Sequence, residues 1–156
     1  KSHYQLHLAG EMDPGFLDWY NKFLTANPEL RTRIIYHGPL KREELYDLYN
    51  RSKILCMPSR YEGLAIVFCE AMFFRNAIVT TPNVSISELL TEESAGVIVN
   101  KDDPSALAQA LTELTAQPQV LKTLGQNAGR VAREKFDWTR IVQALISEID
   151  SRRSNV

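Results

Sequence analysis

Two glutamates separated by seven residues, Glu62 and Glu70, are the side chains of this sequence best placed to do chemistry. Glu70 is the only polar side chain in the run from 66 to 74, so this run is predicted to be buried. A buried ionised carboxylate is costly unless it is hydrogen-bonded or paired. The pattern therefore indicates a group that meets this carboxylate, and a pair of sugar hydroxyls would do so. A local cap or ion pair is the alternative role for Glu70, and a solvated surface charge is the alternative for Glu62.

The residues before Glu70 predict a strand, a turn and a helix. The apolar run 53–57 stops at Pro58, which is typical of a buried strand. The polar stretch 59–63 ends in a glycine, which favours a loop. A helix that begins near Ala65 would direct its first free N–H groups back at this loop, and helix N-termini bind phosphate through such groups. The loop is therefore predicted to bind phosphate.

The two glutamates would flank that loop. Glu62 would stand before the helix, at the mouth of the site, and Glu70 about one turn inside it, on the side that residue 66 shares. Gly63 lets a ligand approach the backbone closely. One loop could then hold a diphosphate between two carboxylates that accept hydrogen bonds from hydroxyls. A nucleotide sugar has this layout, with a ribose, a diphosphate and a hexose in a row.

Short apolar runs alternate with longer amphipathic runs along the rest of the chain. Strands are expected near 5–9, 34–37, 54–57, 77–80 and 97–100, and helices near 16–26, 43–50, 66–74, 86–90, 104–116, 119–135 and 138–151. The Asp102-Asp103 pair before Pro104, and Asp137 before the last helix, are expected to cap their helices. In that last helix, apolar residues from Trp138 to Ile149 keep the helical spacing.

Strand–helix alternation predicts an α/β fold, a Rossmann-like parallel sheet with helices on both faces. In such sheets ligands bind beyond the carboxyl ends of the strands, and the stretch 59–65 lies at one of these ends. The chain of residues 1–156 is predicted to be a single nucleotide-sugar-binding domain, with C-terminal helices from about 118 to 151.

The segment around the two glutamates resembles the E-x7-E element of GT-B glycosyltransferases of family 4, the glycosyl transferases group 1 domain. The family phrase P-S-x-x-E-G-F-G-L-x-x-x-E-A-M-A stands here as residues 58–73. The resemblance extends over nearly the whole chain and implies the C-terminal half of a GT-B fold. Its further segments are Leu8-Ala9-Gly10-Glu11, Tyr36-His37-Gly38-Pro39-Leu40, Ser85-Ile86-Ser87-Glu88-Leu89-Leu90, Ala95-Gly96-Val97-Ile98-Val99 and Phe136-Asp137-Trp138.

The resemblance implies the donor-binding domain of a retaining glycosyltransferase. Such an enzyme transfers a hexose from a UDP- or GDP-sugar, less often an ADP-sugar, to a glycan, lipid or polysaccharide acceptor, and it needs no bound metal or other cofactor. Glu70 would accept hydrogen bonds from the ribose hydroxyls, and Glu62 would be the catalytic carboxylate that orients the hexose. The backbone N–H groups of Gly63, Leu64 and Ala65 would bind the diphosphate and sugar.

Four further positions are expected near the donor by the same resemblance. Ser59 and Arg60 belong to the phosphate-binding loop, although a loop arginine is more often a surface residue. Gly38 and Leu40 lie in the loop against which the family places the nucleotide base, largely through backbone contacts. The neighbouring His37 is more often a packing residue at such a place.

The chain departs from the family pattern at several positions. Ala65 stands for the family's second glycine, Phe74-Arg75-Asn76-Ala77 for C-G-x-P, and Val84-Ser85 for a paired glycine. The family's diphosphate-binding Arg and Lys lie on an earlier strand and loop, and this chain is expected to begin after that element. The acceptor-binding N-terminal domain is expected to be missing as well, so this chain alone is not expected to turn over.

Composition fits part of a soluble enzyme. A net charge of −1 gives no electrostatic case for nucleic acid or an anionic membrane. Cys56 and Cys69 lie in apolar runs, where they are typical buried thiols, and this favours a reducing, cytoplasmic compartment. No apolar run reaches the length of a transmembrane segment. Contact of the full-length protein with the inner face of the membrane stays open.

Two other functions remain open from the sequence. One is a nucleotide-sugar-binding module without transferase activity, which the departures at Ala65 and at 74–77 would suit. The other is a GT-B nucleotide-sugar epimerase. The catalytic groups of the N-terminal half would distinguish an epimerase from a glycosyltransferase.

Overall fold

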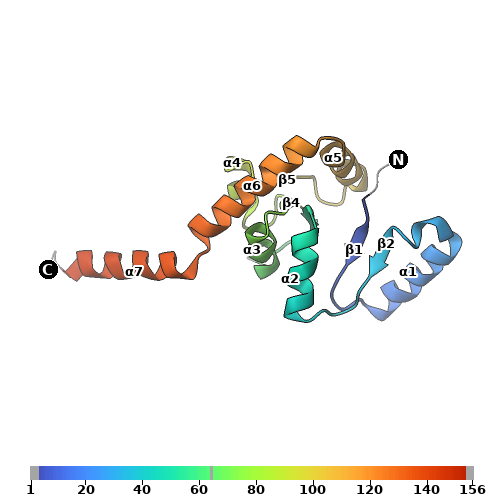
Figure 1. The fold of residues 1–156 in the computed structure, drawn as a ribbon, viewed down its shortest axis with the longest axis horizontal. Helices are drawn as coiled ribbons and strands as arrows, with labels where there is room; N and C mark the ends of the chain where they lie inside the picture. Colours follow the sequence, from blue (N-terminus) through green and yellow to red (C-terminus); the bar gives the residue numbers. More distant parts are fainter. Residues whose placement is uncertain (1–3, 64, 154–156) are drawn as a thin grey trace. The chain divides into compact units, whose positions relative to one another are not determined.

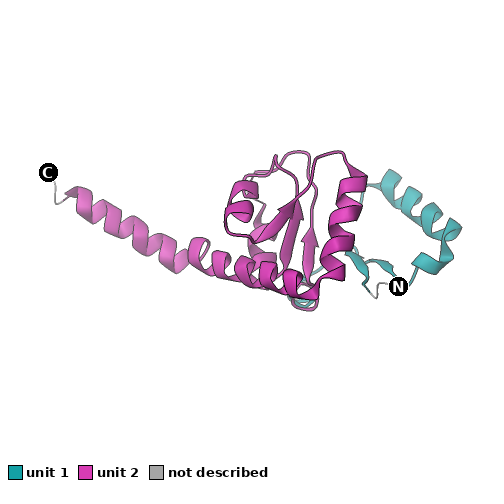
Figure 2. Cartoon of the chain, turned by 90° about the horizontal axis from the view of Figure 1, so that it is seen from above, with its two compact units in different colours: residues 1–48 teal, residues 49–156 magenta. Residues whose placement is uncertain are grey.

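The computed structural model describes residues 4–63 and 65–153, so Leu64 lies outside the described residues. The chain divides into two compact units, Lys1–Leu48 and Tyr49–Val156 (Figure 2). The single domain expected from the sequence stays a prediction.

The first unit is a parallel two-stranded sheet with its connecting helices. It contains β1 (Leu6–Leu8), α1 (Pro14–Ala26), η1 (Pro28–Leu30) and β2 (Ile34–Tyr36), and the boundary with the second unit falls within α2 (Arg42–Arg51). The register places Leu6 beside Ile34 and Leu8 beside Tyr36. The side chain of Asp13 caps α1 by accepting from the N–H groups of Gly15 and Phe16.

The second unit is a parallel three-stranded sheet in the order β3-β4-β5, of which Figure 1 labels β4 and β5. Helices follow each strand along the chain, which is the alternation that the sequence predicts. Its elements are β3 (Ile54–Cys56), α3 (Ile66–Phe73), β4 (Ala77–Thr80), α4 (Ser87–Glu92), β5 (Gly96–Ile98), α5 (Pro104–Ala116), α6 (Pro118–Lys135) and α7 (Trp138–Arg153).

Every predicted strand and helix is present, with ends that differ by no more than about two residues, as is usual for boundaries. The predicted caps are also confirmed. Asp103 Oδ1 accepts from the Ala106 N–H at 2.9 Å, and Asp137 Oδ1 accepts from the Arg140 N–H at 3.1 Å. The short 3-10 helix η1 is an addition to the predicted elements.

The central strand β4 organises the core of the second unit, because all four of its residues are buried. Val79 packs with Val99 and with Leu114 of α5. Ile78, its neighbour in the strand, is fully buried on the opposite face, since side chains alternate along a strand. Helix α6 packs against α3, α5 and β4.

Helices α3 and α6 approach closely where α3 ends. Arg75 has φ of 61° and follows α3 in the left-handed conformation that favours glycine. Its N–H donates to the Met72 carbonyl and the Asn76 N–H to the Ala71 carbonyl, which is the Schellman pattern. A Cβ on Gly125 of α6 would collide with the Arg75 carbonyl oxygen, so glycine at this position permits the approach.

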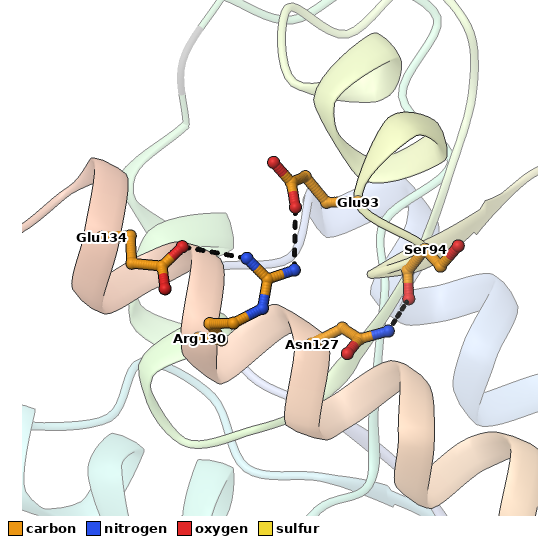
Figure 3. Close-up of polar contacts among 5 residues, drawn as sticks. All are labelled: Glu93, Ser94, Asn127, Arg130 and Glu134. Carbon is orange, nitrogen blue, oxygen red and sulfur yellow. Dashed lines mark hydrogen bonds and ion pairs between the residues drawn. The ribbon is translucent and has the colours of Figure 1, made fainter.

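An ion-pair network joins α6 to the turn between α4 and β5 (Figure 3). Arg130 donates to Glu93 at 2.8 Å and to Glu134 at 2.9 Å, and Asn127 donates to the Ser94 carbonyl at 3.0 Å. The hydrogen bond from Arg130 holds the pKa of the Glu93 carboxyl below its ordinary value. These contacts are exposed and fix the turn rather than the core.

Helix α7 continues from α6 past the three-stranded sheet (Figure 2). The helix itself confirms the predicted spacing, but none of its residues is buried. Trp138 is 77% exposed and Leu145 58% exposed.

Candidate functional site

The segment between β3 and α3 lies at the carboxyl end of the sheet. The pairing with β4 continues beyond β3, since the Met57 N–H donates to the Val79 carbonyl and the Thr80 hydroxyl donates to the Met57 carbonyl, each at 2.9 Å. The Thr81 hydroxyl then donates to the Ser59 carbonyl. The predicted phosphate-binding loop therefore starts from a fixed point on the central strand.

The same loop is bonded to the segment that follows β4. The Glu62 N–H donates to the Asn83 carbonyl and the Ser85 N–H donates to the Glu62 carbonyl, both at 3.3 Å, so Glu62 and Val84 form an isolated parallel bridge. Two side chains add to this bridge. The Asn83 amide donates to the Arg60 carbonyl at 3.1 Å, and the Ser85 hydroxyl donates to the Gly63 carbonyl at 3.0 Å.

Glu62 is a partly buried residue. Among residues 4–63 and 65–153, its carboxylate has no hydrogen-bond or ion-pair partner, although both backbone groups of the residue are bonded. Nothing lies within 4 Å of the position that a Cβ would take at the neighbouring Gly63. A free carboxylate beside an open stretch of backbone suits a residue that binds a hydroxyl-rich ligand.

Glu70 lies one turn inside α3, as predicted. Its Oε2 atom accepts from the Tyr49 hydroxyl at 3.4 Å, which is long for a bond between two oxygens. Glu70 is a partly buried residue, and among the described residues this one contact meets only part of the hydrogen-bonding capacity of its carboxylate.

The prediction that the whole run from 66 to 74 is buried is wrong at its ends. Phe68, Ala71 and Met72 are fully buried, whereas Ile66 is 70% exposed and Phe73 39% exposed. The reason is that α3 packs only one side against β4 and α6, which a run of uniformly apolar residues does not reveal.

Helix α3 starts between the two glutamates without a side-chain cap. Ala65 is the N-cap residue, with ψ of 123°, and it has no side-chain oxygen to accept from the N–H groups of the first turn. Uncapped N–H groups at a helix start can bind an anion. The arrangement is therefore compatible with the predicted diphosphate site, to which Leu64 would also belong.

Arg60 is paired in this structure rather than directed at a free site. Its Nε donates to Asp102 Oδ1 at 2.8 Å, and the two side chains are 84% and 55% exposed. Asp102 follows β5, so two loops at the carboxyl edge of the sheet meet here. An exposed pair of this kind contributes little to stability and costs little to open.

Gly38 and Leu40 belong to the first unit, whereas Glu62 belongs to the second. Gly38 has φ of 69° and its carbonyl accepts from the Gly10 N–H at 2.9 Å. Beside it, a ring nitrogen of His37 lies 2.8 Å from one of His7, with nearly coplanar rings. His7 lies on β1 and His37 directly after β2, 30 residues apart in sequence, which is why sequence spacing did not connect them.

Ser59, Arg60, Glu62, Gly63, Ala65 and Glu70 all lie on one strand–loop–helix segment, as predicted. Tyr49, Asn83 and Ser85 contact this segment and were missed by sequence reasoning. The signal that could have found the last two is the strand order, because loops after adjacent parallel strands meet at one edge.

Among the described residues, no group of three or more His, Cys, Asp or Glu side chains could hold a metal ion. No helix in that part of the chain is long and apolar enough to span a bilayer. Burial raises the pKa of the Cys56 thiol, and burial is also the main reason that the pKa of Cys69 is raised.

Solved structures of GT-B glycosyltransferases have the same fold. Sucrose-phosphate synthase of Thermosynechococcus elongatus superposes with a TM-score of 0.77 at 24% identity, over 97% of this chain and 39% of its own. The C-terminal domain of a glycosyl transferase group 1 family protein of Francisella tularensis gives 0.75 at 21% identity, over 86% and 70%. Anabaena HepE in complex with UDP-glucose gives 0.71 at 19% identity, over 94% and 41%.

Sequence comparison goes further than the fold. The family of glycosyl transferases group 1 matches residues 1–117, and the chain belongs to this family. The lipopolysaccharide core biosynthesis mannosyltransferase LpcC of Rhizobium leguminosarum bv. viciae is 30% identical over 74% of this chain and 32% of its own length. A D-inositol 3-phosphate glycosyltransferase of Xylanimonas cellulosilytica is 27% identical over 75% and 28%. This chain spans roughly a quarter to a third of such relatives.

Proposed function

We propose that this chain is the donor-binding domain of a retaining glycosyltransferase that uses a UDP- or GDP-sugar. The observation that carries the proposal is the Glu62 carboxylate, which has no partner among the described residues and stands before the uncapped start of α3. Glu70 lies one turn inside that helix, so the helix start stands between the two glutamates along the chain. The solved complex of HepE with UDP-glucose, which shares the fold, is compatible with such a donor.

Each residue has a distinct role in the proposal. Glu70 accepts hydrogen bonds from the ribose hydroxyls, and the N–H groups of Gly63, Leu64 and Ala65 bind the diphosphate. As the bond between the anomeric carbon and the diphosphate oxygen breaks, negative charge grows on the diphosphate and positive charge on the hexose. The helix N-terminus stabilises the first charge and the Glu62 carboxylate the second. No metal ion is required for this distribution of charge.

The loop residues complete the donor site in this proposal. Ser59 positions the start of the loop, and Arg60 leaves Asp102 to approach the phosphate, since the exposed pair opens at little cost. The roles of Gly38 and Leu40 at the nucleotide base stay a prediction from the family resemblance.

The acceptor is bound elsewhere in the longer protein. We propose a glycan, lipid or polysaccharide acceptor held by an N-terminal domain, with the enzyme in the cytoplasm or at the inner face of the membrane. The name of the relative in lipopolysaccharide core biosynthesis agrees with this range of acceptors, whereas the D-inositol 3-phosphate in the name of another relative is a small molecule outside it. This chain alone is not expected to catalyse transfer.

A binding module without transferase activity is the second candidate, because Ala65 stands where the family has a glycine and Arg60 is engaged by Asp102. Titration of the full-length protein with a panel of nucleotide sugars, followed by assays for sugar transfer, separates the two. Binding with transfer supports the proposal. Binding without transfer to any acceptor class supports the module, and the absence of binding contradicts both.

The titration has a matched control within the chain. Glu62→Gln and Glu70→Gln should each change donor binding or turnover, whereas Glu29→Gln, an exposed carboxylate in η1, should change neither.

A further inference from the structure

We infer that the segment after β4 is a clamp that positions the Glu62 carboxylate, and that Asn83 and Ser85 are its positioning residues. The inference rests on the proposed function of Glu62. It concerns two residues that contact the loop backbone and not the donor.

The clamp holds the loop at four points. Two are backbone bonds on Glu62 itself, its N–H to the Asn83 carbonyl and its carbonyl from the Ser85 N–H. The other two are side-chain bonds on either side of Glu62. The Asn83 amide reaches the carbonyl two residues before it, at Arg60, and the Ser85 hydroxyl reaches the carbonyl directly after it, at Gly63.

The segment after β4 is itself held in place. The Ser87 hydroxyl at the start of α4 donates to the Pro82 carbonyl at 3.0 Å, and the hydroxyl of Thr81, the residue before Pro82, donates to the Ser59 carbonyl. Val84 lies between the two clamp residues and is 2% exposed, so it anchors the segment in the core. The clamp therefore fixes the loop 59–63, which has no regular secondary structure, relative to the strand β4.

The backbone and the side chain of Glu62 differ in their hydrogen bonding, and this difference indicates that the backbone positions the carboxylate. Both backbone groups are bonded, while the carboxylate has no partner within the part of the chain that the structure describes. A carboxylate acts best on developing charge when its carrier is fixed before the ligand arrives. Asn83 and Ser85 are exposed, so their side chains add little to the core and their bonds go to the loop.

The test uses the full-length protein with Ser85→Ala, Ser85→Thr and Asn83→Ala. Thr91→Ala is the matched control, because the Thr91 hydroxyl makes the same kind of bond to a carbonyl, that of Ser87, but within α4 and away from the loop. Steady-state kinetics with a saturable donor should show kcat lower by about tenfold for Ser85→Ala and Asn83→Ala, with a smaller change in KM. Ser85→Thr keeps the hydroxyl and should recover kcat, and Thr91→Ala should match the parent protein.

A second measurement does not depend on activity. Amide hydrogen exchange at the Glu62 and Ser85 N–H groups should become about tenfold faster in Ser85→Ala, because the side-chain bond no longer supports the bridge. Thr91→Ala should leave both rates unchanged.

The two measurements separate the clamp from the function on which it rests. Faster exchange together with lower kcat supports the inference, and so does recovery by Ser85→Thr. Faster exchange with unchanged kcat overturns the positioning role while transfer activity stands. Unchanged exchange overturns the clamp itself. If the parent protein neither binds nor transfers a nucleotide sugar, the proposed function fails first, and the positioning role fails with it.

Discussion

Helices α3 and α7 are both rich in large apolar side chains, yet some of these side chains are buried in α3 and none is buried in α7. In α3, Phe68 and Met72 are fully buried against neighbouring elements, while in α7 no residue is buried. Helix α3 has almost no amphipathic pattern in its sequence, whereas the apolar residues of α7 keep a regular helical spacing. Helical spacing of apolar residues therefore predicts a helix with an apolar face. How much of that face is buried depends on the elements that pack around the helix.

The difference matters for function because α3 carries Glu70 and begins at the candidate site. Its buried side packs against β4 and α6 and so fixes the helix. The exposed side, with Ile66 and the start of the first turn, is thereby held in place at the candidate site. A helix without buried residues cannot hold catalytic groups in this way.

The largest effect is expected from emptying the buried side of α3. Phe68→Ala removes a fully buried ring and should lower the free energy of unfolding by about 3–5 kcal/mol, since the cavity adds to the lost transfer energy. Chemical denaturation monitored by circular dichroism measures this. A loss below about 1 kcal/mol would mean that the α3 core is not packed as described.

The crossing of α3 and α6 should be the next most sensitive point. Gly125→Ala places a Cβ against the Arg75 carbonyl oxygen, which is backbone and cannot turn away. The expected cost is about 1–3 kcal/mol in the free energy of unfolding. Ala108→Gly in α5 is a useful control for helix propensity, because this exposed alanine lies in a helix of the same unit and its exchange should cost only about 1 kcal/mol.

The two carboxylates should divide ground-state and transition-state effects between them. If the proposed roles hold, Glu62→Gln in the full-length protein should lower kcat at least about tenfold, or about 1.4 kcal/mol, because the charge that would face the developing positive hexose is lost. Glu70→Gln should raise KM with kcat largely intact, since ribose binding is common to both states.

Kinetics with a saturable donor check this division. If Glu70→Gln lowered kcat while Glu62→Gln raised only KM, the two roles would be reversed. If neither variant differed from the parent enzyme, the donor site would lie elsewhere.

A smaller and opposite effect is expected at the end of α3. Arg75 occupies a left-handed position at which glycine has no steric penalty, so Arg75→Gly should raise the free energy of unfolding by about 0.5–1 kcal/mol. Thermal denaturation should therefore give a higher Tm. A lower Tm would show that packing of the Arg75 side chain, which occupies the space beside Gly129 that a Cβ would enter, outweighs the backbone strain.

The smallest effect should come from α7. Leu145→Ala replaces a side chain that is 58% exposed, and the free energy of unfolding should change by no more than about 0.5 kcal/mol. The comparison between the two helices fails if Leu145→Ala costs as much as Phe68→Ala in the same denaturation experiment.

Much of the fold follows from local sequence patterns. The strand 54–57 and the helix that starts at Ile66 were predictable because Pro58 and Gly63 interrupt two apolar runs. Asp103 and Asp137 marked their helices because a cap acts within three residues of its own position. These signals need no knowledge of distant contacts.

For the candidate site, the sequence predicted the positions of residues within one segment but not the contacts of that segment with distant parts of the chain. The E-x7-E spacing placed Glu62 before α3 and Glu70 inside it, as the structure does. The contacts of Asn83 and Ser85 with the loop come from a strand pairing across more than twenty residues, which local pattern does not encode. The contact between Tyr49 and Glu70 was not predicted for the same reason, because the two residues are 21 positions apart in the sequence.

The sequence by itself determined the order and type of the elements, the α/β class, the family and the positions of the two glutamates, because periodicity, caps and breakers act over a few residues. Only the tertiary structure decided which face of α3 is buried, that Arg60 pairs with Asp102, and that the backbone of Glu62 is fixed while its carboxylate is free of described partners. These outcomes depend on which strands lie side by side in a parallel sheet. That neighbourhood brings loops from distant parts of the chain to one edge.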